Sequence, residues 1–128
     1  MRVTSALLLA LSACTSIQMP PPLDGAWRVA ALNGEAVAGT ASFAPGLFVI
    51  GFGCNTMRGG YRIEGDRLIP AGPLGTTEMA CASVGDGPDP MAREARGFAV
   101  ASLPMRIVWE DVRHVRLSNE AGSIDLRR

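Results

Sequence analysis

The sequence contains no lysine, because all twelve of its basic residues are arginine. A P-loop needs a lysine on the phosphates and pyridoxal enzymes need one for the Schiff base, so both chemistries are excluded. Twelve acidic residues balance the arginines, and no segment concentrates charge of one sign. We therefore expect no nucleic-acid partner, since that kind of binding requires a clustered basic surface.

Catalytic and cofactor motifs are also scarce. The single histidine, His114, lies in an expected strand and is predicted to point outward. No G-x-S-x-G nucleophile motif is present, and the Gly51-x-Gly53 pair lacks the third glycine of a dinucleotide-binding loop. No pair among the twelve carboxylates stands out as an acid and a base. We predict a non-enzymatic protein with no catalytic residues, no cofactor and no metal ion.

An apolar run near the N-terminus, residues 3–11, ends in the sequence Leu11-Ser12-Ala13-Cys14. Nine helical residues at about 1.5 Å each are too short for a hydrocarbon core of about 30 Å, so an ordinary transmembrane helix is excluded. The run is typical of a signal peptide. Its last four residues resemble the lipobox of bacterial lipoproteins, which implies cleavage before Cys14 and a lipid on the Cys14 thiol.

This resemblance divides the chain into three parts. We expect a signal peptide at residues 1–13, a lipidated Cys14 with a proline-rich tether to residue 23, and one domain at residues 24–128. Several acyl chains on Cys14 would hold the protein stably at a membrane. By resemblance to enterobacterial lipoproteins, Thr15 after the cysteine implies the outer membrane. The expected location is therefore the bacterial cell envelope, where the protein is lipid-anchored at the outer membrane and faces the periplasm.

Composition and patterning favour an antiparallel β fold. Fifteen glycines and nine prolines indicate many turns. Short strand-like segments separated by turns are typical of an antiparallel meander. The segments lie at residues 27–31, 47–52, 61–63, 67–69, 107–109, 115–117 and 124–126. The turns are Asn33-Gly34, Pro45-Gly46, Gly65-Asp66, Glu110-Asp111 and Ala121-Gly122.

One segment, residues 90–103, follows a helical pattern instead. Asp89 is a candidate N-cap, Pro90 suits the first helical position, and Pro104 ends the segment. The predicted buried stripe consists of Met91, Ala95, Phe98, Ala99, Ser102 and Leu103, opposite Arg93, Arg96 and Gly97. A helix packed on a strongly curved antiparallel sheet gives an α+β domain, with Trp27, Phe98 and Leu103 in one core.

Several motifs, in this order, resemble the META domain family, the group that includes the heat-shock protein HslJ. They are Asp24-Gly25-Ala26-Trp27, Gly53-Cys54-Asn55 followed by Gly60-Tyr61, Thr76-Thr77-Glu78-Met79-Ala80-Cys81, and the helix residues Glu94, Phe98 and Leu103. The resemblance implies a β-rich antiparallel domain with one helix, found in envelope or secreted proteins and often linked to stress. It brings no family-wide set of catalytic residues.

Cysteine usage leaves three alternatives for the domain. If Cys14 is lipidated, Cys54 and Cys81 remain, and two is the number that a disulfide needs in an oxidising envelope. The pair could instead stay reduced as small buried hydrophobes. A metal pair is the third alternative, but a single histidine and no C-x-x-C motif argue against a closed zinc site.

Asn55 and Arg58, with Tyr61, form a candidate recognition surface, because arginine and tyrosine are favoured in protein interfaces. An outward arginine and a core tyrosine are the alternative interpretation of the same segment.

We predict an envelope lipoprotein whose domain binds a protein or another envelope component under stress. Two alternatives remain open: a carrier of a small hydrophobic ligand, and an inhibitor of an envelope hydrolase that uses the loop at residues 83–90.

Overall fold

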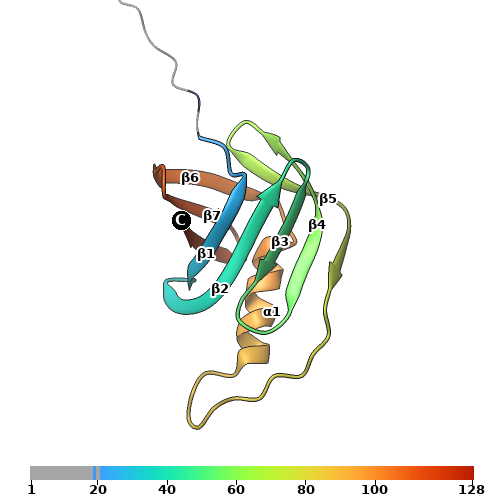
Figure 1. Cartoon of the computed structure of the whole chain (residues 1–128), viewed down its shortest axis with the longest axis vertical. Helices are drawn as coiled ribbons and strands as arrows, with labels where there is room; N and C mark the ends of the chain where they lie inside the picture. The colour runs from blue at the N-terminus through green and yellow to red at the C-terminus, as the bar shows by residue number, and fades with distance from the viewer. Residues whose placement is uncertain (1–18, 20) are drawn as a thin grey trace, which may run out of the picture.

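The computed structural model describes residue 19 and residues 21–128, which form a closed antiparallel barrel of eight strands with one helix (Figure 1). The strands before the helix are β1 (Gly25–Leu32), β2 (Glu35–Ala44), β3 (Leu47–Gly51), β4 (Thr56–Glu64) and β5 (Arg67–Thr76). Helix α1 (Pro90–Ala101) precedes β6 (Met105–Asp111), β7 (His114–Asn119) and β8 (Gly122–Arg127). The predicted signal peptide and Cys14 lie outside the described residues.

The predicted meander is confirmed, but the sheet curves until it closes. Each strand pairs antiparallel with the next along the chain, and β8 pairs with β1. The predicted curved meander with one helix is therefore present as a closed barrel, and the domain is mostly β. Within the described residues, no helix is both long enough and apolar enough to cross a membrane.

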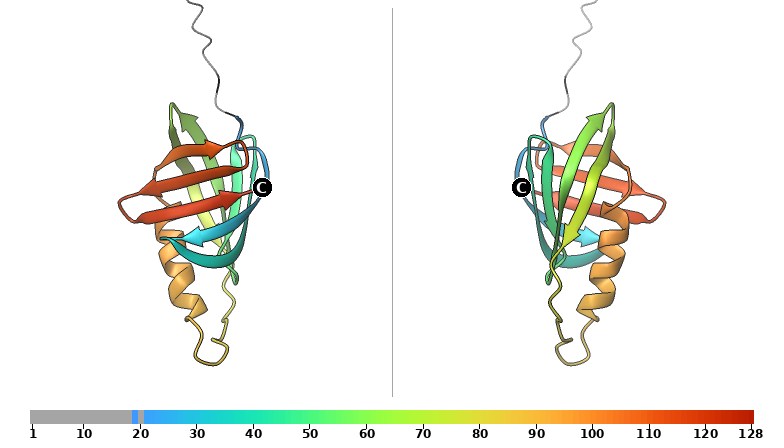
Figure 2. Two further views of the ribbon diagram at one scale, coloured as in Figure 1. Left: turned by 90° about the vertical axis from the view of Figure 1, so that its left-hand side faces the viewer. Right: turned by 90° about the vertical axis from the view of Figure 1, so that its right-hand side faces the viewer.

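The weakest junction of the barrel lies between β5 and β6. Only two residue pairs join these strands, Arg67 with Arg106 and Leu68 with Met105. Helix α1 belongs to the connection between them and packs against β8 and β3. Figure 2 shows α1 and the long loop before it at the end of the barrel away from the N-terminal segment. The helix thus covers the end that the sheet leaves poorly closed.

Strand β1 illustrates how the sequence pattern and the register differ. Trp27 and Val29 point into the core, as predicted, with 3% and 0% of their surface exposed. A bulge between Val29 and Ala31 shifts the register, so Leu32 is buried in place of Ala31. Strand β2 is not predicted from the sequence, because small residues such as Gly39 give it little alternation of apolar and polar positions.

Helix α1 begins where the sequence predicts. The Asp89 carboxylate caps it by accepting a hydrogen bond from the backbone N–H of Met91 at 2.9 Å. Its C-cap is Ser102, so the helix ends two residues before the predicted end at Leu103.

The buried face of α1 is not the predicted stripe. Met91 and Leu103 are 39% and 41% exposed, so the prediction that Leu103 joins the core is wrong. Phe98 is only partly buried, and its ring lies 5.8 Å from that of Phe52. The residues that α1 buries are Glu94, Gly97, Val100 and Ala101.

Two residues account for this rotation of the helix. Gly97 has no side chain, so the helix backbone can approach the buried ring of Phe52 closely. Glu94 points inward because its carboxylate accepts hydrogen bonds from Asn55. A hydrophobic pattern assigns glycine and glutamate to the outer face, and here both lie on the inner one. Arg93, expected to face solvent, is half-buried with its guanidinium beside Gly53.

We predict that Gly97→Ala destabilises the protein, although alanine is the better helix former. A Cβ at this position would overlap the Phe52 ring. Overpacking of this kind costs about 1–3 kcal/mol, whereas helix propensity alone favours alanine by about 1 kcal/mol. Urea unfolding measures the difference. Ala99→Gly on the exposed face is the control and should lose about 1 kcal/mol. A more stable Gly97→Ala protein would contradict the close packing.

Candidate functional site

The loop between β5 and α1 is fastened to the barrel by a disulfide. Cys54 and Cys81 are bonded, with their Cα atoms 6.2 Å apart, so the structure contains the disulfide among the three alternatives. Cys54 follows β3, and Cys81 lies in the loop that precedes α1. The bond therefore ties the start of this long loop to the turn between β3 and β4.

A buried asparagine fastens the same loop a second time. The Asn55 side-chain oxygen accepts hydrogen bonds from the Met79 backbone N–H at 2.7 Å and from the Thr77 hydroxyl at 3.0 Å. Its amide nitrogen donates to the Met79 carbonyl at 2.9 Å. The asparagine side chain thus satisfies the backbone N–H and carbonyl of Met79, which has no partner strand because the loop has left the sheet.

Helix α1 joins this network through Glu94, which is 5% exposed. One oxygen of its carboxylate accepts a hydrogen bond from the Asn55 backbone N–H, and the other accepts one from the Asn55 side chain at 2.9 Å. A buried carboxylate is costly unless it is hydrogen-bonded, so Glu94 and Asn55 depend on each other. The β3–β4 turn, the loop and the helix therefore meet at one residue.

These contacts correct the predicted recognition surface. Asn55 is 2% exposed and its side-chain polar atoms form hydrogen bonds inside the protein, so it presents no surface to a partner. Arg58 is exposed on β4, as a surface residue would be. Tyr61 is 9% exposed and belongs to the core, where its hydroxyl donates to the Ala44 carbonyl at 3.1 Å. The three residues are close in the sequence, but Asn55 and Tyr61 are buried and only Arg58 is exposed.

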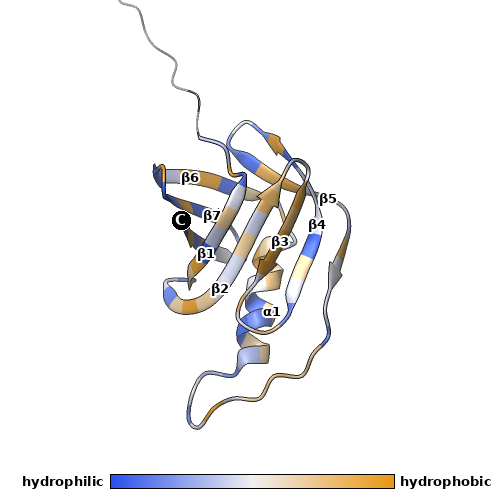
Figure 3. Ribbon diagram, viewed as in Figure 1, coloured by the Kyte–Doolittle hydropathy of each residue, from blue (hydrophilic) through white to orange (hydrophobic). Residues whose placement is uncertain are grey.

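An apolar groove lies where the fastened loop runs beside the helix. We call it the loop–helix groove; it has a volume of about 420 Å³ and is lined by residues 76–80 and by Met91, Ala95 and Phe98, with Asn55 and Glu94 at its base. Met79 is 60% exposed, and Val84, further along the same loop, is 90% exposed. Figure 3 shows hydrophobic residues along this loop, on the end of the molecule away from the N-terminal segment. The helical pattern predicts Met91 in the core, so the sequence alone does not reveal this surface.

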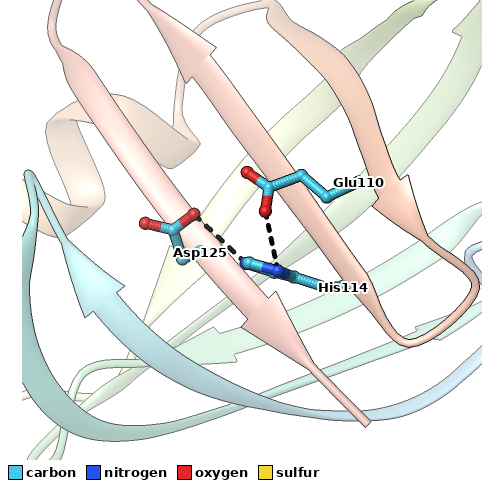
Figure 4. A group of neighbouring side chains, drawn as sticks. All are labelled: Glu110, His114 and Asp125. Atoms are coloured by element: carbon cyan, nitrogen blue, oxygen red, sulfur yellow. Dashed lines mark ion pairs between the residues drawn. The ribbon is translucent and has the colours of Figure 1, made fainter.

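A second polar cluster lies on the outer face of β6, β7 and β8 (Figure 4). The His114 Nδ1 atom is 2.8 Å from the Glu110 carboxylate, and its Nε2 atom is 3.7 Å from that of Asp125. The histidine lies on the outside of the barrel, as predicted, but its side chain is only 16% exposed because the two carboxylates flank it.

Glu110, His114 and Asp125 are the residue types that bind a divalent metal ion, and their ligand atoms lie within 4.8 Å of one another. Arg116 occupies the position of a cation, however. Its Nε donates to Asp125 at 2.9 Å, and its Nη2 lies 3.4 Å from Glu110. The hydrogen bond and charge of Asp125, together with the charge of Glu110, raise the pKa of Arg116 above its usual value. The cluster is therefore an ion-pair network in which one guanidinium serves two carboxylates.

Comparisons with known proteins identify the fold family. The META domain family matches residues 20–121 of this chain. A protein known from an NMR structure is 14% identical, with a TM-score of 0.65 over 82% of this chain and 89% of its own. A protein from Burkholderia xenovorans, also solved by NMR, is 18% identical, with a TM-score of 0.53 over 94% of this chain and 98% of its own. No curated protein matches the sequence.

We predict that Asn55→Ala destabilises the protein by about 3 kcal/mol. The substitution removes the side-chain hydrogen bonds to Thr77, Met79 and Glu94 and leaves the Glu94 carboxylate buried with fewer donors. Chemical denaturation measures the loss. Arg58→Ala, on the exposed face of the neighbouring strand, is the matched control and should change stability by less than about 0.5 kcal/mol. Equal effects would mean that the network does not hold the loop.

Proposed function

The chain belongs to the META domain family, and from that premise we propose that it is a non-enzymatic, membrane-tethered module that binds a protein partner in the bacterial cell envelope. The observation that carries the proposal is the loop–helix groove. It combines exposed apolar side chains with a backbone that is fastened on both sides.

The position of the groove supports this proposal. The described chain begins at one end of the barrel, and the loop and α1 lie at the other (Figure 1). A lipid on Cys14 would therefore leave the groove facing away from the membrane. The disulfide is in keeping with the oxidising compartment that the expected lipoprotein signal implies.

The chemistry of the groove favours a protein ligand. Met79 and Met91 border it, and methionine adapts its shape to a partner's apolar side chains. The hydrogen bonds of Asn55 hold the segment at Met79 before any partner arrives, so little ordering cost remains for binding. An apolar anchor residue of the partner, inserted between the loop and α1, suits this arrangement.

The alternative functions have less support. A hydrophobic-ligand carrier needs an empty interior, and this barrel is occupied by its own side chains, among them Trp27, Phe48, Leu68 and Ile124. An inhibitor that uses residues 83–90 would be a special case of protein binding, and Val84 is the exposed apolar residue of that loop.

We predict that a photo-reactive amino acid at Met91 cross-links to an envelope protein in living cells. Full-length chains carrying the probe at Met91 or at Val112 are compared by mass on gels. Val112 is the matched control, because it is exposed, apolar and located at the β6–β7 turn. A protein adduct at Met91 alone is expected, and it should be lost on Met79→Asp. The absence of any adduct, or the same adduct at Val112, would contradict binding at the groove.

A separate prediction concerns the anchor. Cys14→Ser removes the thiol that the lipid requires, so the protein should move from the membrane fraction to the soluble envelope fraction. Fractionation and mass analysis measure the change, with Cys54→Ser/Cys81→Ser as a control that should keep the lipid. A Cys14→Ser protein that remains in the membrane fraction at unchanged mass would contradict the lipoprotein interpretation.

A further inference from the structure

Closure of the barrel places three basic residues side by side on its outer face. Arg28 of β1 is the register partner of Arg127 of β8, and Arg127 is the register partner of His114 of β7. Each of them adjoins a buried core residue of its strand, so its side chain lies on the outer face. The row runs across three adjacent strands.

Like charges directly opposite each other destabilise a sheet. Arg28 and Arg127 carry no compensating carboxylate: within the part of the chain that the structure describes, neither forms a salt bridge. Other arginines on the surface do, for example Arg62 with Glu64 and Arg106 with Asp66. Among the described residues, no carboxylate thus compensates the repulsion between Arg28 and Arg127.

The three residues also share a polar groove of about 400 Å³, which we call the arginine groove. Arg116 and Asp125 complete its charged lining. Three guanidinium groups therefore face one carboxylate, and Arg116 already engages that carboxylate. His114 adds an Nε2 atom that is buried and has no hydrogen-bond partner among the described residues.

We propose that the arginine groove binds a phosphoryl group. Three guanidinium groups stand against one carboxylate in the lining, or against two when Glu110 beside Arg116 is included, and this positive excess suits a phosphate monoester, which is an anion. The planar guanidinium groups of Arg28 and Arg127 donate paired hydrogen bonds that suit tetrahedral oxyanions. The bound group would relieve their mutual repulsion, and the open groove leaves room for whatever the phosphate is attached to.

This site is independent of the proposed protein-binding function. The arginine groove lies over β1, β7 and β8 and shares no lining residue with the loop–helix groove. A cation is a poor occupant, because the Arg116 guanidinium already contacts both Asp125 and Glu110. A phosphoryl group could come from a free phosphate ester or from a lipid headgroup, and the experiment separates these sources.

The test measures binding of inorganic phosphate, of glycerol 3-phosphate and of phosphatidic acid vesicles to the purified full-length chain by calorimetry, with ionic strength matched by chloride. Arg28→Gln should weaken binding about tenfold, and Arg28→Gln/Arg127→Gln about a hundredfold, as expected when charge-assisted hydrogen bonds are lost. Arg96→Gln removes the same charge from the exposed face of α1 and should leave affinity unchanged.

Binding of the soluble phosphates that depends on Arg28 and Arg127 supports a free ester, and dependence seen only with vesicles supports a lipid headgroup. Binding that the double variant retains, or that Arg96→Gln weakens equally, would overturn the proposal, as would no binding to any of the three probes.

Thermal unfolding provides a readout that does not require tight binding. Without phosphate, Arg28→Gln should melt at the same temperature as the parent or higher, since a repulsion is removed. With phosphate, the parent should gain more in melting temperature than the variant does. Arg127→Gln serves as the second variant. Equal gains for the parent and both variants would overturn the proposal.

Discussion

The side chain of Asn55 holds together three segments that the strand ladder leaves apart. Its side-chain amide forms hydrogen bonds with Thr77 and Met79 of the loop. Both the side chain and the backbone N–H of Asn55 donate to the carboxylate of Glu94. The loop has left the sheet by this point, and α1 also packs against the barrel through Gly97, Val100 and Ala101. The network adds to the disulfide of the loop and to the packing of α1, because an unpaired polar group in this buried place would cost free energy.

The network also determines which side chains form the surface of the loop–helix groove. Because Asn55 and Glu94 satisfy each other inside, the face above them is formed by the apolar side chains that flank them, Met79 and Met91. The disulfide between Cys54 and Cys81 constrains the loop two residues beyond Met79. A surface held from both sides is preorganised, so a partner that binds there loses little affinity to ordering the loop.

The sequence predicted the parts of this structure that depend on local chemistry. The turns at Asn33-Gly34 and Pro45-Gly46, the cap at Asp89 and the antiparallel order of the strands follow from short-range residue preferences. The helix face did not, because its orientation depends on Gly97 meeting Phe52 and on Glu94 meeting Asn55, which are contacts between distant segments. The burial of Asn55 could not be predicted for the same reason. A short polar side chain after glycine and cysteine is typical of an exposed turn, and the loop at Met79, which is distant in the sequence, buries it.

Barrel closure is the long-range event with the widest consequences. It pairs β8 with β1, so Arg28 and Arg127 come into register although they lie near opposite ends of the domain sequence. The same closure brings the Arg128 guanidinium to 4.2 Å from the Trp27 ring, where it also donates to the backbone carbonyls of Pro22 and Asp24. One strand pairing thus fixes the point where the N-terminal segment meets the barrel and creates the unneutralised arginine pair beside it. A meander that stayed open would have neither feature, which ties both to the closed form of the sheet.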